Sequence, residues 1–272
     1  MKTLIGVICL TGLLFSGNVS AEEVSLGVVP QQSASKLARL WTPVAEYLSE
    51  KTGHNVRFVT AKDIPTFEKR LAAGDYDIAY MNPYHYTVFS QTPGYQAFAR
   101  QKNKRIKGIV VVQKDSPLKN LVELKGKSLA FPSPAAFAAS VLPRSHLHTE
   151  GISFTPSYVS SHDSVYLAVA RGFFPAGGGV MRTFNNTDPA IRSQLKVLWT
   201  TEPYTPHALA AHHRLPSSVV EDILAAMLSM NSDHQGKELL DSINFKGIQA
   251  AEDSDWNDVR GLGFDLLSEI VE

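Results

Sequence analysis

Cysteine, an excess of charge of one sign and long apolar segments are all scarce in this sequence. Its 272 residues include one cysteine, and its 26 basic and 26 acidic residues give a formal charge of zero. A balanced charge argues against a nucleic-acid-binding protein, which normally carries a basic excess. Low-complexity tracts and internal repeats of roughly 20–50 residues are absent, which excludes disordered, fibrous and solenoid classes. The length instead suggests two globular domains.

The N-terminal residues have the three-part pattern of a secretory signal peptide. Met1-Lys2 is basic, residues 4–15 are apolar, and Val19-Ser20-Ala21 supplies the small residues that signal peptidase requires. The apolar run is too short to span a bilayer, so we expect cleavage after Ala21 and export to the periplasm. The sole cysteine, Cys9, leaves with this peptide, which excludes disulfides, thiolate metal ligands and a cysteine nucleophile from the mature chain.

Segments with the patterns of strands and helices alternate along the mature chain. Strands are expected at residues 24–29, 56–60, 77–81, 109–112, 128–131, 158–159, 176–180, 195–200 and 208–211. Helices are expected at residues 37–53, 66–73, 135–146 and 163–171, and the segment 217–272 is expected to be mostly helical. This alternating order is typical of an α/β fold with parallel strands and helical crossovers.

Two α/β units in one chain predict two lobes. We expect residues 22–114 and 201–272 to form a discontinuous first lobe, and residues 115–200 to form the second. In α/β units ligands bind at the carboxyl ends of strands, in the loops that lead to helices. Two lobes place two such sets of loops face to face across a cleft, which is the arrangement of a ligand clamp.

Short motifs along the chain occur in an order and spacing that point to one protein family. They are Gly27-Val28-Val29, Trp41-Thr42-Pro43, Asp77-Ile78-Ala79-Tyr80, Ile109–Pro117, and Ser161-His162-Asp163 followed by Leu167-Ala168-Val169-Ala170. Together they cover nearly the whole mature chain, which resembles the phosphonate/phosphite-type substrate-binding proteins of ABC importers. The resemblance implies a two-lobed type II periplasmic-binding-protein fold that closes about a hinge on an oxyanion.

The hydroxyl groups that hold the phosphonate in this family are replaced in this chain. A Ser-Thr-Ser run at the start of a second-lobe helix in the family corresponds here to Ala136, Phe137 and Ala138. Unpaired N–H groups and the dipole at such a helix start still favour an anion. Ser133, one turn earlier, is a candidate to replace the missing hydroxyls.

Other ligand positions of the family also carry different residues here. Two carboxylates that meet the amino group of an aminoalkylphosphonate correspond to Arg182 and to a position near His207. Arg182 repels an ammonium group, so the resemblance implies phosphite, phosphate, a simple phosphonate or another small anion. The two tyrosine contacts of the family correspond to Ile64 and Met81, although other tyrosines are adjacent.

The predicted clamp consists of groups at strand ends and helix starts. Its residues are Gln31, Ser33, Tyr80, Met81, Asn82, Tyr84, Ser133, Ala136, Phe137, Ala138, Ser161, His162, Gly178, Gly179, Arg182 and His207. We expect a protonated His162 to face the anion, Arg182 to pair with it in a bidentate manner, and the glycines to let the backbone approach it. Helix capping, aromatic packing and a flexible glycine turn are the structural alternatives for the same residues.

No residue pattern points to catalysis, a cofactor or a metal. A Gly-x-Ser-x-Gly elbow, a dinucleotide or phosphate-loop glycine motif and a catalytic carboxylate pair are absent. The pairs His146/His148 and His212/His213 lack the i, i+4 spacing of a helical zinc motif. The sequence therefore predicts a binding protein and not an enzyme.

Two functions fit these observations. The first is a periplasmic receptor that delivers a small anion to an ABC permease, and the second is a sensor of the same fold that reports ligand occupancy to a membrane histidine kinase. A weaker third hypothesis, a receptor for a metal or an organic ligand, follows from the loss of hydroxyl groups at residues 136–138. We expect a monomer that binds no nucleic acid.

Overall fold

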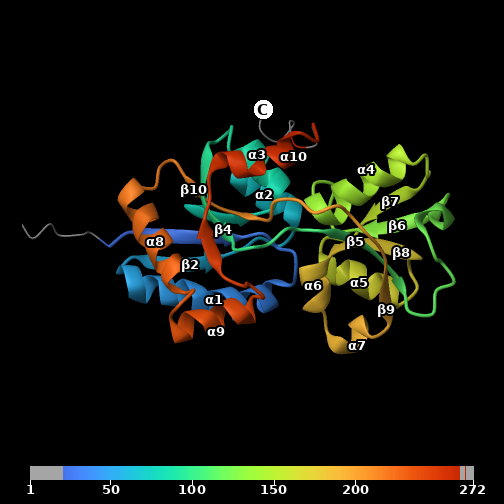
Figure 1. The fold of residues 1–272 in the computed structure, drawn as a ribbon, viewed down its shortest axis with the longest axis horizontal. Coiled ribbons are helices and arrows are strands. Elements are labelled where there is room, and N and C mark those ends of the chain that lie inside the picture. The colour runs from blue at the N-terminus through green and yellow to red at the C-terminus, as the bar shows by residue number, and fades with distance from the viewer. Residues whose placement is uncertain (1–20, 264–266, 268–272) are drawn as a thin grey trace, which may run out of the picture.

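The computed structural model describes residues 21–263 and residue 267, which form two lobes side by side (Figure 1). Two connecting segments, residues 102–107 and 201–207, join the lobes. Residues 1–20 of the expected signal peptide and the end of the expected helical tail lie outside the described residues. Within the described ranges, no helix has both the length and the apolar character needed to cross a membrane.

The first lobe is built on a six-stranded sheet with the order β11-β4-β10-β3-β1-β2. Its strands are β1 (Glu23–Val28), β2 (Asn55–Val59), β3 (Ile78–Met81), β4 (Tyr95–Gln101), β10 (Ala208–His212) and β11 (Ile248–Ala250). Its helices are α1 (Ala34–Thr52), α2 (Ile64–Ala72), α3 (Pro83–Phe89), α8 (Ser217–Ser229), α9 (His234–Ser242), η3 (Asp253–Trp256) and α10 (Asn257–Arg260). β1 and β3 pair in parallel, so their carboxyl ends lie at one edge, where they lead into α1 and α3.

The second lobe is built on a five-stranded sheet with the order β7-β6-β8-β5-β9. Its strands are β5 (Gly108–Gln113), β6 (Ser128–Phe131), β7 (Thr155–Tyr158), β8 (Ala176–Val180) and β9 (Leu195–Thr200). Its helices are η1 (Leu121–Leu124), the π-helical turn η2 (Phe137–Val141), α4 (Leu142–Thr149), α5 (His162–Ala170), α6 (Met181–Asn185) and α7 (Pro189–Arg192). β6 pairs in parallel with β7 and β8, whereas β5 is antiparallel to β8 and β9.

The chain crosses to the second lobe earlier than the sequence analysis expects. β5 pairs with β8 and β9 in the second sheet, so Gly108–Gln113 belong to the second lobe and not to the first. The crossing is residues 102–107. The strands β4 and β11 are absent from the sequence-based expectation. β4 carries polar side chains, β11 has three residues, and both are held by pairing with partners distant in sequence.

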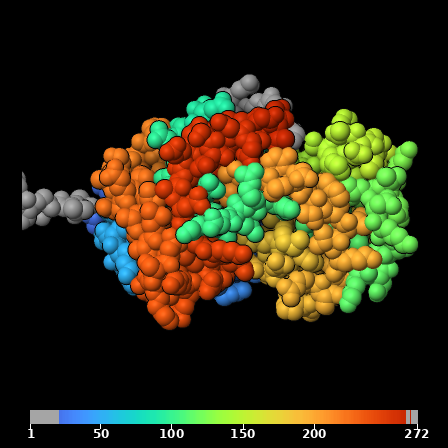
Figure 2. Space-filling view, viewed as in Figure 1, coloured from blue at the N-terminus to red at the C-terminus, as the bar shows by residue number. Residues whose placement is uncertain are grey.

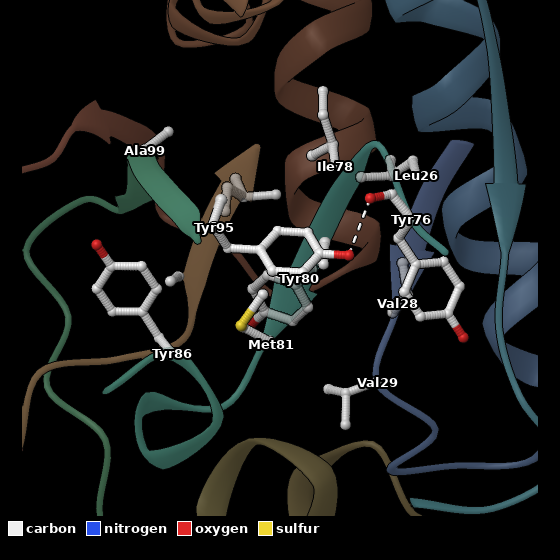
Figure 3. Packing of buried hydrophobic residues seen from close by; sticks show 14 of the residues in the cluster. Leu26, Val28, Val29, Tyr76, Ile78, Tyr80, Met81, Tyr86, Tyr95 and Ala99 are labelled. Carbon is white, nitrogen blue, oxygen red and sulfur yellow. Dashed lines mark hydrogen bonds between the residues drawn. The ribbon is translucent and has the colours of Figure 1, made fainter. Parts of the chain in front are cut away.

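Buried side chains of β1 and β3 form the floor beneath the edge where the two strands end (Figure 3). Val28, Ile78 and Tyr80 are each at most 3% exposed. The hydroxyl group of Tyr95 donates to the carbonyl oxygen of Tyr76 at 2.9 Å, which ties β4 to the turn before β3. Burying an aliphatic side chain such as Val28 contributes about 1.5–3 kcal/mol, so the strand ends are a rigid base for the loops that follow.

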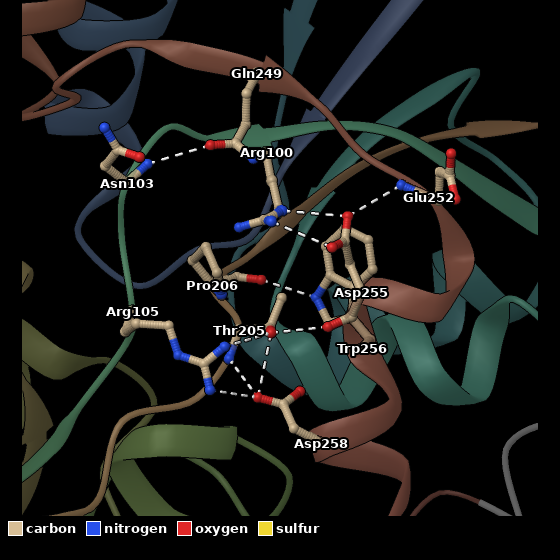
Figure 4. Close-up of polar contacts among 10 residues, drawn as sticks. All are labelled: Arg100, Asn103, Arg105, Thr205, Pro206, Gln249, Glu252, Asp255, Trp256 and Asp258. Atoms are coloured by element: carbon tan, nitrogen blue, oxygen red, sulfur yellow. Dashed lines mark hydrogen bonds and ion pairs between the residues drawn. The ribbon is translucent and has the colours of Figure 1, made fainter.

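The two crossing segments are paired with each other and fixed to the first lobe. Ile106 N–H donates to the Tyr204 carbonyl oxygen at 2.7 Å, and Tyr204 N–H donates back at 2.9 Å. The guanidinium of Arg105 donates to Asp258 at 2.8 Å and to the Thr205 hydroxyl oxygen at 3.0 Å (Figure 4). The backbone N–H of Thr205 donates to the same carboxylate at 2.9 Å. Helix α10 therefore holds both crossings where they leave the first lobe.

The glycines of β8 allow helical segments to lie directly on the second sheet. A Cβ atom added to Gly178 would lie 1.9 Å from the carbonyl oxygen of Ala139, and one added to Gly179 would lie 2.4 Å from the hydroxyl oxygen of Tyr166. Packing of η2 and α5 against β8 therefore requires these glycines. The structure gives Gly178 and Gly179 this packing role in place of the expected close approach to a ligand.

We expect Gly178→Ala to lower the free energy of unfolding by about 1–3 kcal/mol, because the added methyl group must displace the Ala139 carbonyl group. Urea unfolding followed by circular dichroism measures this change. Gly261→Ala is the matched control: the φ of Gly261 is −61°, and the nearest neighbour of an added Cβ is 3.4 Å away. An unchanged stability of the Gly178→Ala variant would contradict the packing of η2 on β8.

Candidate functional site

Loops from both lobes enclose a small cavity at the carboxyl ends of β1 and β3. This inner cavity has a volume of about 10 Å³, which is the space of about one water molecule. It is lined by Val29, Gln31, Ile64, Asn82, Ile106, Ala136, Phe137, Ala138, Ala139, His162, Val180 and His207. The lobes are thus closed on each other, and they meet in the middle of the face drawn in Figure 2.

A second cavity, of about 20 Å³, adjoins the inner cavity on the side of the crossing segments. This hinge cavity is lined by Tyr80, Gln101, Lys104, Ile106, Lys107, Val180, Met181, Arg182, Pro206 and His207. The two cavities share Ile106, Val180 and His207. They are therefore two parts of one cleft between the lobes.

Gln31, in the loop from β1 to α1, contacts three cleft residues. Arg182 Nη2 donates to Gln31 Oε1 at 2.6 Å, and the backbone N–H of His162 donates to the Gln31 carbonyl oxygen at 3.0 Å. The guanidinium can only donate, so the amide oxygen must face Arg182 and the amide nitrogen donates to His207 Nε2, 3.0 Å away. His207 therefore accepts at Nε2, and a neutral ring carries its proton on Nδ1.

Tyr80 forms the wall of the cleft at the end of β3. Its ring stacks on the His207 ring, with centroids 4.9 Å apart and an interplanar angle of 20°. It also contacts the ring of Trp41 in α1, with centroids 4.9 Å apart. The Arg182 guanidinium carbon lies 5.9 Å from the centroid of Tyr80. Aromatic packing from the first lobe thus positions the cation that the second lobe contributes.

The imidazole of His162 is neutral in the closed cleft. Burial, and then the positive charge of Arg182, lower the pKa of His162 to about 3. Its Nδ1 atom forms a hydrogen bond with the Thr183 hydroxyl group, at a distance of 2.9 Å. The protonated imidazole expected from the sequence is therefore wrong for this closed state, because desolvation disfavours the charged form.

The pKa of His207 is also held well below its usual range, by burial first and then by the charge of Arg182. Both cleft histidines are thus neutral hydrogen-bonding groups at neutral pH. Among the described residues, none with a formal charge lines the inner cavity; Arg182, which lines the hinge cavity, donates to Gln31 of the inner cavity.

Three helices of the cleft begin at polar residues that act as caps. The Asn82 side chain accepts from the His85 N–H at 2.8 Å and donates across the cleft to the Ala135 carbonyl oxygen at 3.2 Å. The hydroxyl oxygen of Ser161 accepts from the Ser164 N–H at 3.1 Å. Ser33 caps α1 in the same way. Ser33, Asn82 and Ser161 therefore act as helix caps, and Asn82 also lines the inner cavity.

The start of η2 brings unpaired backbone donors to the inner cavity. Among the described residues, no group accepts a hydrogen bond from the N–H of Phe137, Ala138 or Ala139. These are the first N–H groups of a helical segment, which have no partner within the helix, and all three residues line the inner cavity. Ser133 is 1% exposed, and its hydroxyl group has no hydrogen-bond partner among the described residues.

The structure brings together part of the predicted clamp. The predicted residues that line one of the two cavities are Gln31, Tyr80, Asn82, Ala136, Phe137, Ala138, His162, Arg182 and His207. Those that line neither cavity are Ser33, Met81, Tyr84, Ser133, Ser161, Gly178 and Gly179. Met81 and Tyr84 are buried in the first lobe, and Ser33 and Ser161 cap helices.

Two lysines of the hinge cavity, Lys104 and Lys107, are missing from the predicted clamp. They belong to the basic segment 101–107, Gln-Lys-Asn-Lys-Arg-Ile-Lys, which is visible in the sequence. The sequence analysis ends the first lobe at residue 114, so this run of charge lies outside its expected cleft. A crossing placed at residues 102–107 would have included these lysines among the residues expected at the cleft.

One histidine of each pair considered for a metal, His146 and His212, has a packing role. His146 stacks on Trp199, with ring centroids 4.4 Å apart, and His212 packs against Tyr95. In residues 21–263 and 267, no group of three or more His, Cys, Asp or Glu side chains is arranged to hold a metal ion.

Comparison with known proteins gives one family and one fold. The family model described as "ABC transporter, phosphonate, periplasmic substrate-binding protein" matches residues 26–256. The chain is 24% identical over 234 residues to the phosphate-import protein PhnD of Mycolicibacterium smegmatis, an alignment that covers 74% of this chain and 70% of that protein.

Two solved structures share the arrangement of both lobes. A binding-protein component of an ABC phosphonate transporter from Pseudomonas aeruginosa has a TM-score of 0.82 and 17% identity, over 90% of this chain and 86% of the other. PhnD1 from Prochlorococcus marinus in complex with methylphosphonate has a TM-score of 0.81 and 20% identity, over 89% of this chain and 97% of the other. The expected two-lobed type II periplasmic-binding-protein fold is thereby confirmed.

We expect the neutral His162 to make the folded protein less stable as the pH falls. An unfolded histidine binds a proton near pH 6.5, whereas the folded pKa is about 3, so stability is lost between these values. The slope from one such group is at most about 1.4 kcal/mol per pH unit. Urea unfolding at pH 7, 6 and 5 should give a shallower loss for His162→Asn than for the unmodified protein.

His234 provides the control for this titration, because its side chain is 90% exposed. His234→Asn should keep the pH slope of the unmodified protein. Equal slopes for His162→Asn and the unmodified protein would contradict a neutral, buried His162.

Proposed function

Because the chain belongs to the family of phosphonate-type periplasmic substrate-binding proteins of ABC transporters, we propose that it binds a small oxyanion of the phosphonate, phosphite or phosphate type between its lobes. It then presents the closed form to a membrane permease and catalyses no reaction. The family match extends over residues 26–256, which include both sheets and the cleft. The family resemblance found in the sequence motifs is confirmed by this match.

The observation that carries the proposal is the row of unpaired N–H groups at the inner cavity, from Phe137, Ala138 and Ala139. Oxyanion oxygens accept hydrogen bonds from such backbone groups, and the helix dipole adds to the attraction. Side-chain hydroxyls are therefore not required at these positions. Arg182, whose guanidinium contacts the neutral Gln31 amide at 2.6 Å, exchanges that partner for a charged oxygen, which is the stronger acceptor.

The relatives and the lining of the cleft support the ligand class. One relative is named for phosphate import, and the Prochlorococcus protein holds methylphosphonate in its structure. No aspartate or glutamate is among the residues that line the inner or hinge cavity. A ligand with an ammonium group would lack a counter-charge there, so phosphite, phosphate and simple phosphonates fit better.

Closure of the lobes is the event that the permease reads. The cleft contacts of Asn82 with Ala135 and of Arg182 with Gln31 join the two lobes. A ligand that touches both lobes favours the closed state over the open one. The paired crossings at Ile106 and Tyr204 are the hinge about which the lobes rotate.

The family is periplasmic, and the proposed route to the periplasm is cleavage of the signal peptide after Ala21. The proposed form is a monomer that binds no nucleic acid. A sensor that signals to a histidine kinase would use the same closed surface, but membership in a family of ABC transporter components favours the permease. Stimulation of the permease ATPase in vesicles by the liganded protein distinguishes the two roles.

The ligand class can be tested by thermal shift on residues 22–272. The panel contains phosphite, phosphate, methylphosphonate, sulfate and zinc, with and without EDTA. A ligand at a thousand times its Kd stabilises the fold by about 4 kcal/mol, which for a protein of this size raises the Tm by roughly ten degrees. We expect such a shift with at least one phosphorus oxyanion; a shift with zinc alone, or with nothing, would rule out the proposed function.

Two substitutions test the cleft itself. We expect Arg182→Ala and His162→Ala each to weaken binding of that oxyanion at least tenfold, about 1.4 kcal/mol. Each removes a polar group that lines the cleft. Arg144→Ala and His148→Ala are matched controls, since both residues line a groove on the outside of the second lobe. Unchanged affinity in both cleft variants, with an intact fold by circular dichroism, would place the ligand elsewhere.

A further inference from the structure

The hinge cavity carries more positive charge than one small oxyanion needs. Three cationic side chains line it, those of Lys104, Lys107 and Arg182, and acidic side chains are absent from its lining. Arg105, from the same segment, is not available to a ligand because it pairs with Asp258. The hinge cavity is therefore basic through residues that have no acidic partner in the described structure.

Lys104 is the central cation of this group. Its side chain is partly buried, and among the described residues it has no hydrogen bond and no ion pair. Burial first, and then the positive charges of Lys246 and Arg182, lower the pKa of Lys104. Like charges in a partly desolvated place destabilise one another, so an anion that enters the hinge cavity relieves this repulsion.

The hinge cavity also adjoins the inner cavity, where the proposed function places the phosphorus oxyanion. The two share Ile106, Val180 and His207, so a single layer of side chains separates them. Two groups of one small ligand can therefore lie on either side of these shared residues.

Resting on the proposed function, we infer that the hinge cavity binds a second anionic group of the ligand. The preferred ligand class is a phosphonate or phosphate ester with a carboxylate or second phosphoryl group close to the phosphorus. Arg182, Lys104 and Lys107, which all line the hinge cavity, supply its counter-charge. An ammonium group at the same position is repelled by all three cations.

Isothermal titration calorimetry with three probes tests this specificity. Methylphosphonate has only the phosphonate group, phosphonoacetate adds a carboxylate, and 2-aminoethylphosphonate adds an ammonium group. We expect phosphonoacetate to bind at least tenfold more tightly than methylphosphonate, and 2-aminoethylphosphonate to bind more weakly than methylphosphonate. Equal affinity for methylphosphonate and phosphonoacetate would overturn the inference and leave the proposed function intact. Failure of all three probes to bind would overturn the inference, and failure of phosphite and phosphate as well would overturn the proposed function.

The double variant Lys104→Ala, Lys107→Ala tests the two lysines that line the hinge cavity. The ratio of the methylphosphonate Kd to the phosphonoacetate Kd should fall at least fivefold toward one. Lys237→Ala is the control, because Lys237 is an exposed residue of α9 that lines neither cavity, and it should keep the ratio of the unmodified protein. An unchanged ratio in the double variant, or an equal fall in the Lys237→Ala control, would overturn the assignment of these lysines.

Discussion

The pairing of the two crossing segments is the constraint on which the candidate binding site depends. The cleft is made of loops from two sheets that share no strand, so its geometry is set by how the lobes are joined. Ile106 and Tyr204 pair through their backbones, and Arg105 with Asp258 fixes both segments to the first lobe. A small rotation at this hinge moves every second-lobe residue relative to Gln31 and Asn82 at the ends of β1 and β3.

The positive charge of the cleft lies on its arginine and lysine side chains, because burial keeps its two histidines neutral. The two cleft histidines are desolvated and neutral, while the Arg182 guanidinium, which cannot lose its proton in a protein, stays charged. Backbone N–H groups at Phe137–Ala139 add donors that cannot titrate. A low local dielectric strengthens each of these interactions with an anion. The candidate site therefore combines a pH-independent guanidinium with uncharged donors.

Part of this site could be predicted from the sequence because its residues lie beside recognisable strand ends. Asn82 and His162 follow strands or caps whose local pattern is strong, and both line the cleft. Gly178 and Gly179 were harder to interpret: a glycine run indicates a close approach but does not say whether a ligand or another part of the protein approaches. Lys104 lies outside the predicted clamp because the chain crosses to the second lobe before residue 108, earlier than the predicted lobe boundary at residue 114.

The sequence alone determined the α/β class, the order of most strands and helices, and the family, because periodicity and short motifs are local properties. Tertiary structure decided which sheet holds β5, what β4 and β11 pair with, and which polar residues cap helices and which face the cleft. These depend on contacts between segments far apart in the chain. The neutral state of His162 is of the same kind, since its pKa is set by burial between two lobes and by Arg182.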